Sequence, residues 1–176
     1  MPVAGLTIVV ITNKMTMVAK SIQAEIKQTK PFPSLEEEAA IALARTADQL
    51  GRHFDELFKA HGLTGTQYNV LRILRGAGKA GLACSEIATR MISRDPDITR
   101  LLDRTERAGW CTRSRNTNDR RVIIARITAK GMEILKELDR PVEELNKRVL
   151  GPMSNSRLRS LLRLLEGVRE VAARFC

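Results

Sequence analysis

The stretch SRDPDITRLLDRTERAGWCTRSRNTNDRRVIIARIT, residues 93–128, begins with a helical residue pattern and ends with a strand-like one. Asp95 is expected to cap the helix and Pro96 to open it, because a proline at the first helical position loses no hydrogen bond. One helical face is largely apolar and carries Ile98, Leu101, Leu102, Thr105 and Ala108. The opposite face is polar and carries Thr99, Arg100, Asp103, Arg104 and Arg107. Gly109 is expected to end the helix, since glycine readily adopts a left-handed conformation.

Beyond Gly109 the pattern predicts a two-stranded ribbon with a basic tip. Residues 110–115 alternate between two faces, residues 116–119 favour a turn, and residues 122–127 are rich in β-branched side chains. A helix with an arginine-bearing face fits the major groove of DNA, and a tip carrying Arg120 and Arg121 suits phosphates or the minor groove. A solvated helix before an ordinary hairpin is the simpler interpretation, but helix, glycine and basic ribbon in succession favour a nucleic-acid interface.

The composition is that of a folded, basic and mainly helical protein. The chain has 176 residues, of which 43% are hydrophobic but only 3% aromatic, so its core must be built from aliphatic side chains. The formal net charge is +10. Residues 63–126 carry 13 Lys or Arg against 6 Asp or Glu, whereas residues 34–62 carry 3 against 6. Because the positive excess lies on the predicted reading segment, double-stranded DNA is a better partner than a membrane surface.

Several classes of function lack the residues that they need. The sequence contains no run of 18 apolar residues that could span a membrane. Cys84, Cys111 and Cys176 show no paired spacing, which favours a reducing cytoplasm over a disulfide framework, and no zinc or other metal site is expected. Without a glycine-rich phosphate loop, paired metal ligands or a nucleophile beside a base, we expect neither an enzyme nor a cofactor.

The middle of the chain predicts a helix-turn-helix. A helix over residues 34–60 and one over residues 64–76 each begin with a capping box. These boxes are Ser34 with Glu37 and Thr64 with Gln67. A short helix over residues 84–91 then precedes the helix of the opening stretch. With the basic ribbon, this order makes a winged helix-turn-helix.

Long apolar stripes flank this module on both sides. One lies within residues 43–61, one within residues 132–149, where Pro141 is expected to kink the helix, and one within residues 158–175 after a break at Gly151. They offer more apolar surface than one small chain is expected to bury, so we infer a homodimer with a two-fold interface.

The chain is therefore expected to divide into four regions. They are an N-terminal arm at 1–33, partly ordered at best, a dimerisation helix at 34–62, the winged helix-turn-helix at 63–128, and C-terminal dimerisation helices at 129–176. Two interpretations of the arm stay open: a poorly ordered leader, or a segment, Ile22 to Phe32, that packs on a partner subunit.

A series of short motifs occurs in an order and spacing that resembles a known family. They are Thr64-x-x-Gln67-Tyr68, Ser85-Glu86-Ile87-Ala88, Thr99-Arg100-Leu101-Leu102-Asp103-Arg104, Gly109-Trp110, and Asp119-Arg120-Arg121 leading to Ile127-Thr128-x-x-Gly131. Over about residues 34–167 the chain resembles the MarR family of bacterial winged helix-turn-helix transcription regulators. The resemblance implies a mainly α-helical fold with a small β-wing, in which interlocking N- and C-terminal helices of a dimer hold two winged modules.

The resemblance also implies roles for single residues. Thr99 and Arg100 would face DNA from the recognition helix, and Ser85 would contact phosphate from the start of its helix. Arg121 would enter the minor groove, and Asp119 would hold the wing by pairing with a nearby arginine. The expected DNA-binding residues are Ser85, Arg94, Asp97, Thr99, Arg100, Arg104, Arg113, Arg115, Asp119, Arg120 and Arg121.

Some of these positions carry open alternatives. Ala83 stands where many relatives have a threonine cap, which should cost on the order of 1 kcal/mol of helix stability. Asp97 could read a cytosine amino group or reject other bases, or it could serve only the helix dipole. For Arg113, Arg115 and Arg120, phosphate contact and a role in solubility alone both stay open.

The expected function is a homodimeric, sequence-specific regulator that represses from a palindromic operator. In this scheme a small ligand, for which aromatic compounds are one candidate class, binds between the dimerisation helices and the winged helix-turn-helix. The ligand-bound dimer then holds its two recognition helices at a spacing that does not fit DNA. One alternative is a repressor that senses thiol oxidation, since Cys84 near a helix N-terminus could have a lowered pKa. Oxidation sensors of this family usually carry their cysteine on the first long helix, where this chain has none. Another alternative is an architectural DNA-binding protein without sequence specificity.

Overall fold

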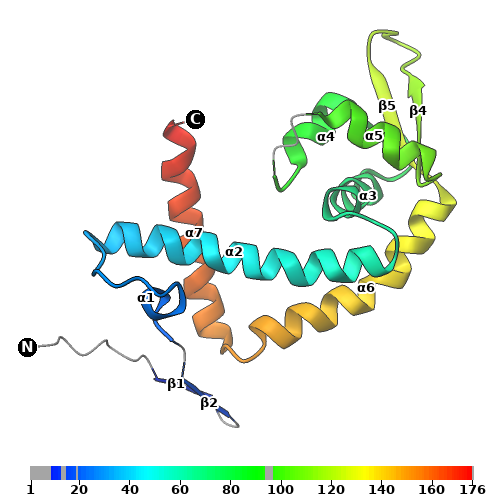
Figure 1. Ribbon diagram of the computed structural model, residues 1–176. Coiled ribbons are helices and arrows are strands. Elements are labelled where there is room, and N and C mark those ends of the chain that lie inside the picture. Colours follow the sequence, from blue (N-terminus) through cyan, green and yellow to red (C-terminus); the bar gives the residue numbers. More distant parts are fainter. Residues whose placement is uncertain (1–8, 13–14, 19, 94–96, 176) are drawn as a thin grey trace, which may run out of the picture. The chain divides into compact units, whose positions relative to one another are not determined.

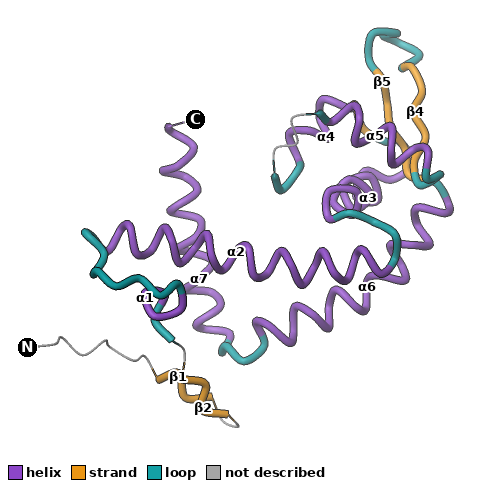
Figure 2. Tube along the Cα trace, viewed as in Figure 1, coloured by secondary structure: helices purple, strands orange, loops and turns teal. Residues whose placement is uncertain are grey.

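The computed structural model describes residues 9–12, 15–18, 20–93 and 97–175. The chain divides into two compact units, Gly51–Glu144 on the one hand and Met1–Leu50 with Leu145–Cys176 on the other. Two long helices, α2 (Leu35–Ala60) and α6 (Ala129–Leu150), contribute residues to both units. The described residues are mainly helical, as the sequence predicted, and strands are confined to two small sheets (Figure 1, Figure 2).

The unit Gly51–Glu144 combines short helices with a small antiparallel sheet. Its helices are α3 (Gly65–Ala77), α4 (Cys84–Arg90) and α5 (Ile98–Arg107), with a 3-10 turn, η1 (Gly78–Ala80), after α3. Its strands are β3 (Leu82–Ala83), β4 (Cys111–Arg115) and β5 (Ile123–Ile127), in the order β3-β5-β4. Figure 2 shows β4 and β5 projecting as a hairpin, paired from Cys111–Ile127 to Arg115–Ile123. This arrangement confirms the predicted winged helix-turn-helix.

The helix ends follow local chemistry, with one correction. Thr64 and Gln67 form the predicted capping box at the start of α3, and Gly109 ends the α5 segment at a φ of 78°. The predicted start of α5 was wrong: the helix begins at Ile98 and its cap is Asp97, whose side chain accepts a hydrogen bond from Arg100 N–H. Asp95 and Asp97 are equally able to cap a helix, so the sequence pattern alone does not show which of them is the cap. Asp95 and Pro96 lie outside the described residues.

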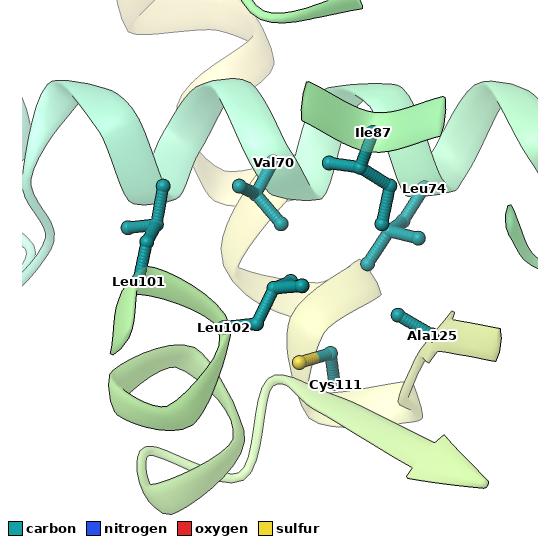
Figure 3. Packing of buried hydrophobic residues seen from close by; sticks show 7 residues of the cluster. All are labelled: Val70, Leu74, Ile87, Leu101, Leu102, Cys111 and Ala125. Atoms are coloured by element: carbon teal, nitrogen blue, oxygen red, sulfur yellow. The ribbon is translucent and has the colours of Figure 1, made fainter. Parts of the chain in front are cut away.

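Two apolar clusters hold this unit together. In the first, buried side chains of α3, α4, α5, β4 and β5 converge (Figure 3); they are Val70, Leu74, Ile87, Leu101, Leu102, Cys111 and Ala125. The second joins the ends of α2 and α6 to α3 and the wing base, through Phe58, Leu63, Leu71, Trp110, Leu135 and Leu138. Because the inner face of α5 is buried in the first cluster, the outer face of α5 is fixed toward solvent.

The other unit contains the two chain ends. A hairpin of β1 (Val9–Thr12) and β2 (Met15–Val18) precedes a short helix, α1 (Ile22–Glu25). The Glu25 carboxylate accepts hydrogen bonds from Arg45 Nε at 2.8 Å and Gln49 Nε2 at 2.6 Å, both on α2. The segment from Ile22 to Phe32 thus contacts the long helix of its own chain.

The C-terminal part of that unit is a helix with exposed apolar side chains. α6 continues through Pro141 and ends at Leu150, where Gly151 was expected to break it. After it come α7 (Asn155–Ala172) and a 3-10 turn, η2 (Ala173–Phe175). Aliphatic and aromatic side chains lie exposed on these elements: Leu162, Leu164, Val168, Val171 and Phe175. Among the described residues, none of the helices combines the length and apolarity needed to cross a bilayer.

Candidate DNA interface

The outer face of α5 is polar, arginine-rich and open to solvent. Thr99, Arg100, Arg104 and Arg107 are exposed, while Leu101, Leu102 and Thr105 on the opposite face of the same helix are fully buried. An open groove of about 520 Å³ runs along this outer face and is lined by Asp97, Arg100, Asp103, Arg104 and Arg107. The groove thus offers three guanidinium groups, each able to donate several hydrogen bonds to a phosphate or a base edge.

Asp97 and Arg100 form a unit at the start of this helix. One carboxylate oxygen of Asp97 accepts from the Arg100 backbone N–H at 3.0 Å, and the other lies 3.0 Å from Arg100 Nε. The Arg100 side chain is nevertheless 83% exposed, so it projects outward from its cap. Asp97 therefore caps α5, a role that the sequence pattern had assigned to Asp95 and not to Asp97.

The wing tip is organised by short polar side chains. Asn116 Oδ1 accepts from the Asn118 backbone N–H at 2.8 Å, and Asp119 Oδ1 accepts from the Arg121 backbone N–H at 2.9 Å. The expected pairing of Asp119 with an arginine side chain is not seen in the described part of the chain, where one oxygen of its carboxylate holds the backbone turn instead. Arg120 and Arg121 are exposed at this tip.

Arg113, at the base of the wing, faces inward. Its guanidinium donates to Glu106 from Nε at 2.9 Å and from Nη2 at 2.8 Å, and Nη2 also pairs with Asp103. Its side chain is only 20% exposed. The hydrogen bond from Arg113 holds the pKa of the Glu106 carboxyl below its usual range. Arg115, two residues further along β4, is exposed instead.

The other predicted site residues lie at the start of α4 or outside the described part. Ser85 is exposed in the first turn of α4. The N-cap of that helix is Ala83, which provides no side-chain cap, as the sequence indicated. Arg94 lies outside the described residues, so only its neighbours on α5 can be placed.

Sequence reasoning missed three residues that hold the reading elements in place. Glu106 anchors Arg113, and Asn69, which is 4% exposed on α3, accepts from the Ile92 backbone N–H at 2.9 Å. Lys130 Nζ donates to the Ala108 carbonyl at 2.9 Å. All three contacts join segments far apart in the sequence or across a turn, and no local pattern marks them.

The thiols of this unit do not have the character that oxidation sensing needs. Burial raises the pKa of the half-buried Cys84 thiol rather than lowering it, although Cys84 begins α4. Burial likewise raises the pKa of Cys111 to about 11. Both groups are protonated near neutral pH, and it is the thiolate that reacts. The premise of the thiol-sensing alternative, a lowered Cys84 pKa, was therefore wrong.

The reading helix and the basic wing define a class, the winged helix-turn-helix DNA-binding regulators. The profile of the MarR family matches residues 63–123. A MarR transcription factor of Planctomyces limnophilus, known from a crystal structure, is 39% identical and superposes with a TM-score of 0.60 over 77% of this chain and 98% of that one. The chain belongs to the MarR family.

Two further relatives extend this comparison. The homoprotocatechuate degradative operon repressor of Escherichia coli is 27% identical over 126 residues, which cover 72% of this chain and 84% of the repressor. The PcaV regulator of Streptomyces coelicolor, solved with its natural ligand, is 22% identical and shares the fold with a TM-score of 0.67 over 81% of this chain and 99% of that one. The relatives are transcription regulators, not enzymes.

Proposed function

We propose that this protein is a homodimeric repressor that binds a palindromic operator and is released by a small ligand. The observation that carries the proposal is the pairing of α5, buried on one face and arginine-rich on the other, with an adjacent wing whose tip exposes Arg120 and Arg121. Such a module places one element in the major groove and another against the backbone or minor groove. The protein would act in the cytoplasm, where its operator lies.

Within this proposal the exposed residues take separate roles. Thr99, Arg100 and Arg104 face base edges, because arginine can donate two hydrogen bonds to guanine. Arg120 and Arg121 at the wing tip reach the minor groove or its phosphates. The flanking contacts to phosphate come from Ser85, Arg94 and Arg115. Asp97 and Asp119 act indirectly, as the cap of α5 and the brace of the wing turn.

Dimerisation is supported by the exposed apolar surface of the C-terminal elements. Leu164 is 70% exposed and Phe175 is 85% exposed, although both are large hydrophobic side chains. A second copy related by a two-fold axis would bury this surface. Such a dimer would present two α5 helices to successive major grooves, which lie about 34–36 Å apart.

Release of the protein from DNA by a ligand is supported only by its similarity to other regulators, and these relatives also suggest the chemical class of the ligand. PcaV binds a natural ligand, and the Escherichia coli relative represses an operon for degrading an aromatic acid. We therefore propose a small aromatic acid that stabilises a dimer whose α5 helices have the wrong spacing for DNA. Binding of the ligand would then lower the affinity for DNA, and binding of DNA would lower the affinity for the ligand by the same factor.

Binding to the DNA upstream of the protein's own gene tests this function. The dissociation constant is measured on that DNA and on random DNA of equal length across a range of salt concentrations, and R100A is expected to weaken only the specific complex strongly. The exposed Arg159 on α7 gives a charge-matched control, R159A. Equal affinity for both DNAs would overturn the proposal and favour an architectural protein.

A further inference from the structure

Arg113 differs from the exposed arginines of α5 and of the wing tip, because most of its side chain is covered. It lies on β4, directly after the turn that follows α5, and its side chain is 20% exposed where that of Arg100 is 83% exposed. Glu106 receives three of its hydrogen bonds, from the backbone N–H at 2.7 Å, from Nε at 2.9 Å and from Nη2 at 2.8 Å. Asp103, one turn earlier on α5, pairs with the same Nη2.

These contacts join α5 to the wing, the two elements that bind different parts of the DNA in the proposed function. Asp103 and Glu106 belong to α5, and Arg113 pairs in the sheet with Ala125, which is fully buried in the core. A planar guanidinium that donates to one carboxylate through two nitrogens fixes direction as well as distance. The link therefore sets the angle between α5 and the root of the wing.

The charges around Arg113 point the same way. Two carboxylates lie on the margin of a surface that must accept phosphates, and each would repel them if unpaired. The guanidinium between them offsets this charge and uses its Nε and Nη2 donors inside the protein. A phosphate contact through these same donors would require Arg113 to leave both carboxylates exposed to the DNA.

We propose that Arg113 is a positioning residue that locks the wing to α5, so that helix and wing tip engage DNA as one rigid reader. This inference rests on the proposed function and deepens it, and it replaces both roles left open for Arg113 from the sequence, phosphate contact and solubility alone. Glu106 is its principal partner. Arg115, on the same strand but exposed, is the matched residue that contacts phosphate.

The first test compares R113Q, R113K, E106Q and the control R115Q on operator and random DNA over a range of salt concentrations. For R113Q we expect roughly tenfold weaker operator binding with an unchanged salt slope, whereas R115Q lowers the slope by about 1. E106Q removes a negative charge, so electrostatics alone predicts tighter binding, but a positioning role predicts a loss like that of R113Q. The double variant should then bind no worse than either single variant. R113K should restore part of the loss.

The second test needs no DNA and separates this inference from the proposed function. Amide hydrogen exchange over residues 111–127 should accelerate in R113Q and E106Q, with exchange in α3 unchanged, and R115Q should match the wild type. Unchanged wing exchange in R113Q, or a salt slope that falls as in R115Q, overturns the positioning role. If the wild type fails to distinguish operator from random DNA, the proposed function falls, while the exchange result still decides the link between wing and helix.

Discussion

The ammonium group of Lys130, in the first turn of α6, donates to the backbone carbonyl of Ala108 at the C-terminal cap of α5, at a distance of 2.9 Å. Thr128 supports the same junction, because its hydroxyl donates to the Gly109 carbonyl at 2.7 Å. The last carbonyls of a helix have no partner within the helix, and a cation there also complements the helix dipole. The first turn of α6 therefore completes the end of the recognition helix.

Replacing Lys130 should loosen that end. We expect K130M to lower the free energy of unfolding by on the order of 1 kcal/mol, because it removes a charge-assisted hydrogen bond at a solvent-exposed site. The control is K136M on the same helix, at an exposed lysine, which should change stability by less than about 0.5 kcal/mol. Urea unfolding measures both variants, and equal stability of the two would remove this role for Lys130.

Gly131 should not tolerate a side chain. A Cβ built at this position would overlap the Trp110 carbonyl oxygen and would come within 2.8 Å of Ile127 Cγ1. Backbone cannot move aside cheaply, so we expect G131A to cost roughly 2–3 kcal/mol. Gly51, also helical but with nothing within 4 Å of its built Cβ, provides the control. G51A should stabilise the protein by up to about 1 kcal/mol. Thermal unfolding compares the two, and a G131A midpoint at or above that of wild type would contradict the overlap.

Local signals explain which parts of this fold could be predicted from sequence. The capping box of Thr64 with Gln67 and the left-handed Gly109 depend only on neighbouring residues, and both were predicted correctly. The family motifs likewise led to the winged fold. The start of α5 was placed at Asp95 instead of Asp97, since both aspartates can cap and only the path of the chain selects one.

The candidate site was harder to predict because its residues act across a turn. Arg113 alternates with exposed neighbours along β4 and looks like another basic wing residue. The side chain of Arg113 faces inward because the chain turns at Gly109, between α5 and β4. This turn brings Glu106 within hydrogen-bonding distance of Arg113. Asp119 shows the converse case, where a short side chain near a turn binds the backbone instead of a distant arginine.

The buried thiol of Cys111 should make stability fall at high pH. Burial raises its pKa to about 11, so the folded protein keeps the proton where the unfolded chain, titrating near the ordinary value of about 9, releases it. The stabilisation is complete below about pH 9 and is lost as pH rises toward 11, by on the order of 2–3 kcal/mol. Urea unfolding of wild type and C111A at pH 8 and at about pH 10.5 isolates this group, and their difference in stability should shrink at the higher pH. A constant difference would contradict the raised pKa.

Asn69 should govern how the chain enters the recognition helix. Its Oδ1 accepts from the Ile92 N–H at 2.9 Å, whereas its Nδ2 is buried and has no hydrogen-bond partner within the described part of the chain. The acceptor is therefore the useful half of this amide, and removing it leaves the Ile92 N–H without its partner. We expect N69A to cost about 1–2 kcal/mol and to weaken operator binding, because the segment before α5 loses its tie to α3.

A matched control separates this tie from the general effect of losing an asparagine. Asn146 is exposed on α6, so N146A should change the free energy of unfolding by less than about 0.5 kcal/mol and leave DNA binding unchanged. Hydrogen exchange of the Ile92 amide distinguishes the mechanisms, since it should accelerate in N69A more than exchange in the core of α3. If N69A lowers stability but the Ile92 amide stays protected, the cost comes from the cavity left in α3, and the hydrogen bond does not position the recognition helix.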